Sequence, residues 1–247
     1  MASASSATGL HAVWQRADVA RRFLDERSLL IPHREEQLAI MLRLLRTGRE
    51  PRRALDLGCG GGILLATLLA AFPDARGVGV DYSPPMLEAA REKLAEFGAR
   101  ALLREGDLGS PAWLEAAEGP FDAVVSGYCI HHLPDEGKRA VYAEIFSLLA
   151  PGGLFVHAEH VASATPEGEA LFDDAMSEHL HRRRTERGEQ VTLEEVRRDF
   201  LTRPDRAANK CVPVEPQLEW LRDIGFEQVD CYWKWFELAI FAGKRPG

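Results

Sequence analysis

The chain has 247 residues and is acidic, with 30 Lys and Arg against 38 Asp and Glu and a formal net charge of −8. This charge disfavours binding to nucleic acid through general attraction to phosphates. A hydrophobic content of 46% is enough to bury a core, and no apolar run approaches the roughly 20 residues of a membrane-spanning helix. We therefore expect a globular protein with a small-molecule substrate and no membrane partner.

The spacing of the cysteines bears on the cellular compartment in which the protein works. Cys59, Cys129, Cys211 and Cys231 are widely separated and form no C-x-x-C pair, so neither a disulfide framework nor a cysteine-based zinc site is expected. The first residues also lack the basic start and apolar segment of a secretion signal. Both features favour a reducing cytoplasmic location, and the sequence carries no indication of an oligomeric state.

Residues 1–50 are expected to form a helical cap. Val19 and Phe23 share a helical spacing, and apolar residues recur at three- and four-residue intervals between Leu38 and Leu45. Pro32 separates the two segments.

Residues 51–164 alternate short apolar runs, such as "ALDLG", "GVGVD" and "FDAVVSG", with helical patterns such as "PPMLEAAREKLAEF". This alternation is typical of βαβ units, in which helices cover both faces of a mostly parallel sheet. The sequence therefore predicts an α/β core over this range.

A charged, helical segment at 165–215 interrupts the alternation and is interpreted as an inserted lid. Residues 216–247 then supply a helix, "EPQLEWLRDIG", and two β-prone runs, "FEQVDCYWKW" and "FELAIFAGKR". Their close spacing predicts an antiparallel hairpin or a bulged edge strand that completes the same domain.

A glycine-rich loop, "DLGCGGG", lies between a predicted strand and a predicted helix. Its glycines allow a tight turn and a close approach of ligand to backbone. The spacing of Asp56, Gly58, Gly60 and Gly62 is D-x-G-x-G-x-G, whereas a dinucleotide fingerprint would need glycine where Ile63 stands. The loop therefore favours a ligand other than NAD.

Two further acids follow the next two predicted strands. Asp81 ends "GVGVD", where a carboxylate can accept hydrogen bonds from both hydroxyls of a ribose, and Asp107 follows in "EGDL". Ligands of open parallel sheets bind beyond the carboxyl ends of the strands. One binding crevice beside all these acids is therefore expected.

The ordered series "ALDLGCGGG", "GVGVDYSPPMLEAAR", "EGDL", "FDAVVSGYCIHHLPD" and "LLAPGGLFVHAEH" resembles the motifs of class I S-adenosylmethionine-dependent methyltransferases. The resemblance covers residues 52–161 and is specific as a series. It implies a Rossmann-like, seven-stranded, mostly parallel sheet that ends in an antiparallel hairpin, and it implies S-adenosylmethionine as cofactor.

Cofactor contacts follow from this resemblance by matching position. The glycine loop would lie under the methionine part, with Asp56 near its amino group, and Asp81 would hold the ribose. Ser126 would face the methionine or the sulfonium. The residues implied around the adenine are Tyr82, Met86, Asp107 and Leu108.

Histidines and a carboxylate supply candidate catalytic groups. His131, in "GYCIHHLPD", is a candidate general base, although packing of one imidazole against the cofactor or capping of the next helix is the favoured interpretation. In "LFVHAEH", strand alternation puts His157 and Glu159 on one face and His160 on the other. Glu159 or His160 would orient the acceptor or take its proton, with a structural polar contact to the N-terminal cap as the alternative, whereas His157 is assigned a structural role. No metal site is predicted, because these side chains would not converge on one ion.

Trp14, Tyr128 and Arg206 are the expected substrate-binding residues, contributed by the cap, the strand end and the lid. The basic run "HLHRRRTERGE" has two interpretations, a site for an anion or RNA and a solvated helix face, and the second is favoured.

The sequence thus predicts transfer of a methyl group to an O, N or C nucleophile of a small molecule. The alternatives are an RNA or tRNA methyltransferase, a related cofactor-modifying enzyme, and a non-catalytic S-adenosylmethionine-binding protein. The cap, lid and hairpin also resemble enzymes that make carboxy-S-adenosylmethionine. That activity is not transferred, because the glycine loop lacks their serine-leucine after the cysteine.

Overall fold

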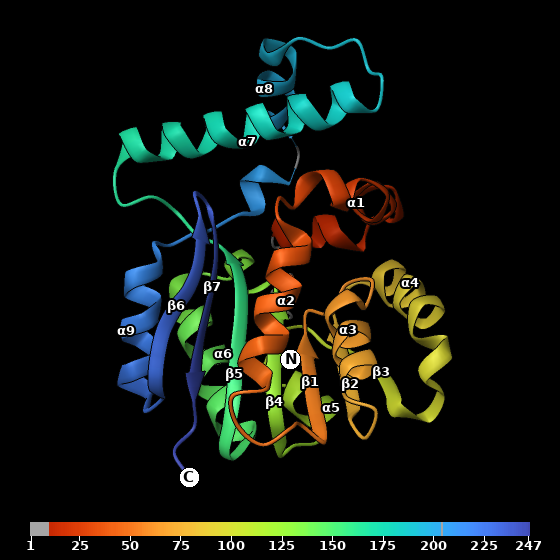
Figure 1. Ribbon diagram of the computed structural model, residues 1–247, viewed down its shortest axis with the longest axis vertical. Helices are drawn as coiled ribbons and strands as arrows, with labels where there is room; N and C mark the ends of the chain where they lie inside the picture. The colour runs from red at the N-terminus through yellow and green to blue at the C-terminus, as the bar shows by residue number, and fades with distance from the viewer. Residues whose placement is uncertain (1–9, 204) are drawn as a thin grey trace, which may run out of the picture.

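The computed structural model describes residues 10–203 and 205–247, which build a seven-stranded mixed sheet in the order β3-β2-β1-β4-β5-β7-β6 (Figure 1). The first five strands in this order run parallel to one another, and β7 is antiparallel to both β5 and β6. This topology confirms the predicted Rossmann-like sheet and its terminal hairpin. The strands are β1 (Arg53–Leu57), β2 (Arg76–Asp81), β3 (Ala101–Glu105), β4 (Phe121–Gly127), β5 (Leu149–His160), β6 (Glu227–Trp235) and β7 (Leu238–Lys244).

Helices cover both faces of the sheet, which explains why its central strands are continuous apolar runs. The face with the cluster around Leu65 and Leu68 carries three helices, α2 (Arg34–Leu45), α3 (Ile63–Ala71) and α4 (Pro84–Leu94). The opposite face, with the cluster around Tyr142 and Phe155, carries α5 (Trp113–Ala117), α6 (Asp135–Leu148) and α9 (Val214–Ile224). Edge strand β6 instead alternates between exposed and half-buried residues, as expected with one open side.

The strand order reverses at β1, whose neighbours are β2 and β4. The loops that leave the carboxyl ends of β1 and β4 diverge there, and such a switch point is where open α/β sheets bind ligands. The short 3-10 helix η3 (Ile130–His132) follows β4 at this edge, and a second, η2 (Ala95–Arg100), follows α4 away from it.

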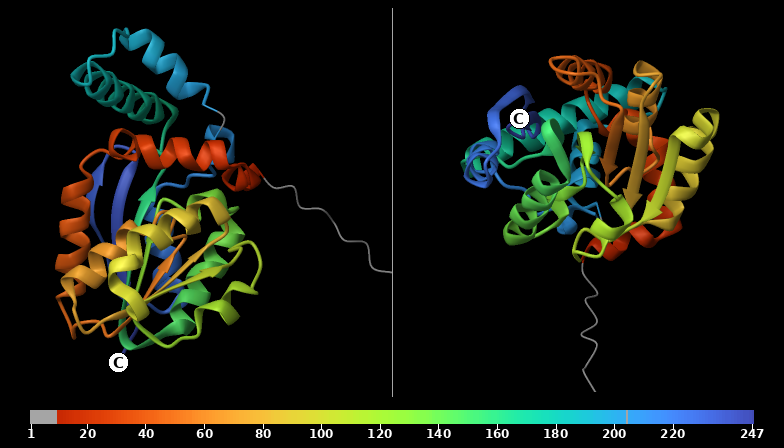
Figure 2. Two further views of the ribbon diagram at one scale, coloured as in Figure 1. Left: turned by 90° about the vertical axis from the view of Figure 1, so that its right-hand side faces the viewer. Right: turned by 90° about the horizontal axis from the view of Figure 1, so that it is seen from below.

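Two helical layers lie over the carboxyl ends of the strands. The first contains η1 (Leu10–Gln15) and α1 (Ala17–Leu30), which cross directly above the sheet (Figure 2). The second is the lid, formed by α7 (Pro166–Glu186), α8 (Leu193–Leu201) and η4 (Arg206–Ala208). Lid helices α7 and α8 share an apolar cluster with Leu238 at the start of β7, so the lid is anchored to the sheet.

The 21-residue helix α7 is polar over most of its length. Its basic run is paired with acids, since Arg183 contacts Glu186 at 2.7 Å and Arg184 contacts Glu189 at 2.7 Å. These ion pairs support the interpretation as a solvated helix face. Over the described ranges, no helix combines the length and apolar content needed to cross a membrane.

Asp56 is a fully buried carboxyl at the carboxyl end of β1. Its Oδ2 accepts the backbone N–H of Leu65 at 3.0 Å, which fixes the first turn of α3 against the strand. Its Oδ1 has no hydrogen-bond partner among the described residues. Burial, aided by the nearby charge of Asp81 and opposed by the Leu65 N–H, raises the pKa of Asp56 to about 7.

This raised pKa predicts a specific dependence of stability on pH. Between about pH 4 and pH 7 the folded protein keeps a proton on Asp56 that the unfolded chain releases, so this residue's contribution to stability falls as pH rises. Asp56→Asn cannot ionise, so its free energy of unfolding should increase relative to the wild type across this window, by an amount on the order of 3 kcal/mol. Urea unfolding at a series of pH values measures this difference.

Asp122→Asn is the matched control. Asp122 Oδ2 accepts the backbone N–H groups of Arg52 and Arg53 at 2.9 Å in an exposed position at the other end of the sheet. Because this carboxylate lies outside the core, Asp122→Asn should not gain stability over the wild type between pH 4 and pH 7. The absence of such a gain in Asp56→Asn would contradict the assignment.

Candidate functional site

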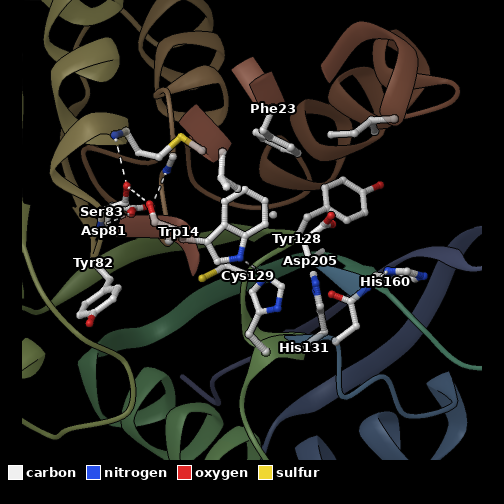
Figure 3. Close-up of a pocket in the computed structure, with 18 of the residues that line it drawn as sticks. Trp14, Phe23, Asp81, Tyr82, Ser83, Tyr128, Cys129, His131, His160 and Asp205 are labelled. Atoms are coloured by element: carbon white, nitrogen blue, oxygen red, sulfur yellow. Dashed lines mark hydrogen bonds between the residues drawn. The ribbon is translucent and has the colours of Figure 1, made fainter. Parts of the chain in front are cut away.

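A cavity of about 370 Å³ lies at the carboxyl ends of the strands, beneath α1 and the lid (Figure 3). One end is bounded by the glycine loop, Asp81 and Asp107, and the other by His131, His160 and Glu237. Apolar side chains from α1, α7 and α8 cover it, among them Phe23, Met176 and Phe200. The cavity thus joins the predicted cofactor end to the predicted acceptor end.

The glycine loop forms the floor of the cofactor end. Gly58 (φ 66°) and Gly60 (φ 50°) line the cavity in the left-handed region that favours glycine. A Cβ on Gly58 would lie 2.2 Å from the Cys129 Sγ, whereas a Cβ on Gly60 would meet no atom within 4 Å. Gly62 (φ 75°) packs against Leu94 and is not part of the cavity wall.

Asp81 connects this loop to the next helix. Its Oδ2 accepts the Gly60 N–H at 2.7 Å, and its Oδ1 accepts the Ser83 N–H at 2.8 Å. Burial raises the pKa of Asp81, although these backbone donors oppose the rise. The Ser83 side chain in turn caps α4 at Met86.

Besides Gly62, which lies off the wall, the structure brings seven of the ten sequence-predicted cofactor residues onto the cavity wall: Gly58, Gly60, Asp81, Tyr82, Met86, Asp107 and Leu108. The open space at Gly60 and the row of strand-end acids fit a ligand with a nucleoside at one end and an amino acid at the other. Asp107 itself forms a turn, with its Oδ1 accepting the Gly109 N–H at 2.8 Å.

Two implied cofactor contacts lie elsewhere. The Ser126 hydroxyl is buried and donates to the Leu57 carbonyl at 2.8 Å, and the residue lines a small pocket beneath α2. Asp56 is enclosed between β1 and α3 and does not reach the cavity. The resemblance places these residues by sequence position, whereas the structure holds their side chains inside the core, on the Leu57 carbonyl and the Leu65 N–H.

Trp14 lies in the centre of the cavity wall, from η1 (Figure 3). Its indole N–H donates to His132 Nε2 at 3.1 Å, and its carbonyl accepts from the Ser83 hydroxyl at 2.6 Å. His132 Nδ1 lies 3.2 Å from the Ala208 carbonyl, so the ring is neutral with its proton on Nδ1. Burial, reinforced by His131, keeps the pKa of His132 well below its usual value. One imidazole therefore joins the cap to the lid.

A buried carboxylate, Glu159, holds the histidine cluster together. Its Oε1 lies 2.6 Å from His131 Nδ1, and its Oε2 accepts the His131 backbone N–H at 2.9 Å. His157 Nε2 lies 2.9 Å from the same Oε2, at an angle unsuited to a hydrogen bond. The backbone N–H of His160 donates to Oε1 at 2.8 Å.

The electrostatics of this cluster fix its protonation. Burial alone would raise the pKa of Glu159, but the imidazoles of His131 and His157 outweigh it and hold the pKa well below its usual value. Glu159 is therefore ionised, and its charge places the His131 proton on Nδ1. His131 Nε2 is then left as an acceptor, on a residue that lines the cavity.

Strand alternation was predicted correctly, but it does not keep the cluster apart. His157 and Glu159 share one face of β5 and His160 the other, while His131 reaches both because η3 lies at the strand tip; its ring centre is 5.5 Å from that of His160. Glu159 lies behind His131 and does not line the cavity. Over the described residues, no group of three or more His, Cys, Asp or Glu is arranged to hold a metal ion.

Of the predicted substrate-binding residues, Trp14 and Tyr128 line the cavity and Arg206 does not. Tyr128 lines the cavity, with a left-handed φ of 55° and its hydroxyl donating to Gln37 on α2 at 2.8 Å. Arg206 does not line it, because two hydrogen bonds of 2.9 and 3.0 Å hold its guanidinium on Asp173. Arg203 takes the place on the wall that was assigned to Arg206.

Sequence reasoning missed several wall residues. Val19, Phe23 and Ile31 come from the cap, where the helical spacing of the first two was a usable signal. Glu237, between two aromatic strands, gave no signal, since a hairpin residue is normally exposed.

Comparisons with known proteins agree with this geometry. Residues 54–153 match the model of a methyltransferase domain. A trans-aconitate 2-methyltransferase of Methylobacterium radiotolerans is 39% identical over 104 residues, which are 42% of this chain and 36% of that protein. A carboxy-S-adenosyl-L-methionine synthase of Helicobacter hepaticus is 26% identical over 237 residues, 93% of each chain.

Among solved structures, an O-methyltransferase family protein from Burkholderia thailandensis superposes with a TM-score of 0.67 at 19% identity, over 98% of this chain and 64% of that one. At this identity the similarity supports the fold. The chain thus spans less than two thirds of the first of these relatives and of this structural neighbour.

The domain match, the ordered motifs and the sheet topology all indicate a methyltransferase domain. Residues 54–153 thus form a methyltransferase domain of the class I, S-adenosylmethionine-dependent type.

Proposed function

We propose that this protein methylates a hydroxyl oxygen of a small, largely apolar molecule. The observation that carries the proposal is the pair formed by His131 and Glu159, with 2.6 Å between Nδ1 and Oε1 at the acceptor end of the cavity. A hydroxyl needs a base as it becomes a nucleophile, and an imidazole oriented by a buried carboxylate provides one.

S-adenosylmethionine, once bound, would supply an activated methyl group for transfer from its sulfur to the acceptor oxygen. His131 Nε2 takes the hydroxyl proton and becomes an imidazolium. Glu159 stabilises that cation through Nδ1–H and through the backbone contact to His131. Glu159 is thus a positioning residue, and His160, which lines the same wall, is proposed as an acceptor contact.

The walls of the cavity support an apolar acceptor. Phe23, Leu133, Met176 and Phe200 line it beside Trp14, and the cap and lid exclude water from the reacting groups. We assign the other end, from Gly58 to Leu108, to the cofactor, with Asp81 at the ribose and Tyr82 and Met86 beside the adenine.

A second candidate is modification of the cofactor itself, which the full-length similarity to the Helicobacter hepaticus synthase favours. The reaction product separates the two. Methyl transfer yields S-adenosylhomocysteine and a methylated acceptor, whereas modification yields a heavier cofactor, and mass spectrometry distinguishes them. An RNA acceptor is less well supported, because arginines of the α7 basic run are paired with acids.

Replacement of the proposed base tests the mechanism. His131→Asn should lower the rate of methylation of a simple phenol by about 10²- to 10⁴-fold, the usual contribution of a general base. A nitrophenol that is largely ionised at the assay pH needs no base, so its rate should fall much less. Single-turnover rates with both phenols give the comparison.

His33→Asn is the control, because His33 is solvent-exposed, does not line the cavity and has the left-handed backbone (φ 56°) that Asn tolerates. It should leave both rates unchanged. Equal losses for the two phenols in His131→Asn would contradict a base role.

A further inference from the structure

Glu237 is a buried carboxyl in an unusual place. It is the second residue of the two-residue turn between β6, which ends at Trp235, and β7, which begins at Leu238. Its side chain is only 5% exposed and lines the acceptor end of the cavity. The turn that aims it inward has Phe236 at a φ of 44°, a conformation that bulky residues rarely adopt.

The carboxyl of Glu237 has no hydrogen-bond donor among the residues that the structure describes. Its nearest basic group is His160, whose Nε2 lies 3.6 Å from Oε1, beyond hydrogen-bond range. His160 is neutral, because burial, with His131 and Arg203 adding to the effect, lowers its pKa to about 3. The Asn209 amide lies 3.5 Å from His160 Nδ1, which directs the ring proton on Nε2 toward Glu237.

The nearby arginines are already engaged. Arg206 holds Asp173 through two hydrogen bonds, and Arg203 pairs with Asp205 at 3.2 Å. Each arginine is thus neutralised by its own acid, so Glu237 lacks a counterion of its own. A buried carboxyl without a partner is unfavourable, and a hairpin residue could have avoided this by pointing into solvent.

Burial without a counterion therefore favours the protonated form of Glu237. Burial raises the pKa of Glu237 to about 8; Arg203 and Arg206 oppose the rise, while the charges of Asp173 and Glu169 add to it. A positive charge placed beside the carboxyl would lower the pKa of Glu237 and favour its ionised form.

We propose that Glu237 recognises a protonated amine on the methyl acceptor, so that the substrate class is a small aromatic or otherwise apolar alcohol that carries a basic nitrogen. The inference rests on the proposed function of the same cavity. His131 would face the hydroxyl that is methylated, Glu237 would face the ammonium group, and His160 lies between them.

The charges of the wall favour an amine over the other polar groups. An ammonium supplies the missing counterion, and the neutral His160 donates to the resulting carboxylate. A carboxylate on the acceptor would instead meet Glu237 and Asp205, while Arg203 is held by Asp205 and the Phe200 carbonyl. When the ammonium binds, Glu237 loses its proton to solvent and the pair is neutral.

Three phenols that differ at one end provide the test: tyramine, 4-hydroxyphenylethanol and 4-hydroxyphenylacetate. Their binding to the full chain saturated with S-adenosylhomocysteine is measured by calorimetry. The amine should bind about tenfold or more tightly than the alcohol, and the acid most weakly. In two buffers of different ionisation enthalpy, amine binding at neutral pH should show proton release.

Glu237→Gln should abolish both the preference for the amine and the proton release. Glu227→Gln is the matched control, because Glu227 lies on β6 of the same hairpin but is exposed and does not line the cavity; this variant should keep both. As a test of folding, Glu237→Gln should gain stability relative to the wild type as pH rises from about 4.5 to 8, since in the wild type the unfolded chain then releases a proton that the folded protein keeps on this carboxyl.

Equal binding of amine and alcohol, preference for the acid, binding of none of the three, or a preference that survives in Glu237→Gln would overturn the proposal. The outcome is separable from the proposed function, because binding is measured without methyl transfer. An amine preference that depends on Glu237, without methylation of any phenol when S-adenosylmethionine is supplied, would refute the function and leave the recognition site standing.

Discussion

The ionised carboxylate of Glu159, fully enclosed between two histidines, is the interaction on which the acceptor end of the site depends. A charge at this depth is tolerable only because His131, His157 and the backbone N–H of His160 surround it. The same contacts fix η3 against the end of β5 and hold the His131 ring toward the cavity. One buried charge thus fixes strand, helix and the proposed base in a single geometry.

The sheet supplies the other half of the site through its topology. Because the strand order reverses at β1, the glycine loop, the end of β2 and the end of β4 open onto one crevice. The cap and lid then close it, and His132 connects them by accepting from Trp14 and bonding Ala208. Cofactor binding and acceptor enclosure therefore share parts of one continuous wall, as expected where water must be excluded.

The core fold was predictable from sequence because its signals are local. Alternating apolar runs and helical spacing depend on neighbours in the chain, and the glycine loop and the strand-end acids at Asp81 and Asp107 followed from motif order. The orientation of individual side chains was less accessible. The side chains of Ser126 and Asp56 are held inside the core by backbone hydrogen bonds. Arg206 is held by Asp173, a partner 33 residues away in the sequence.

The histidine cluster shows the same limit. Strand alternation correctly separated His160 from Glu159, but His131 contacts both because a different loop meets the strand tip. The burial of Glu237 could not be predicted from sequence, because it depends on a turn that folds inward beneath the lid. Contacts between residues far apart in the chain produce no periodic pattern in the sequence, so the sequence does not predict them.

The central claim, that an ionised Glu159 orients His131 as a base, is tested most directly by the tautomer of the His131 ring. Two-bond ¹⁵N–¹H correlation spectra of histidine-labelled protein, with His131→Asn used to assign the resonance, report which nitrogen carries the proton. The account predicts a neutral ring protonated on Nδ1, with Nε2 free to accept. A ring protonated on Nε2 and bare at Nδ1 would contradict it.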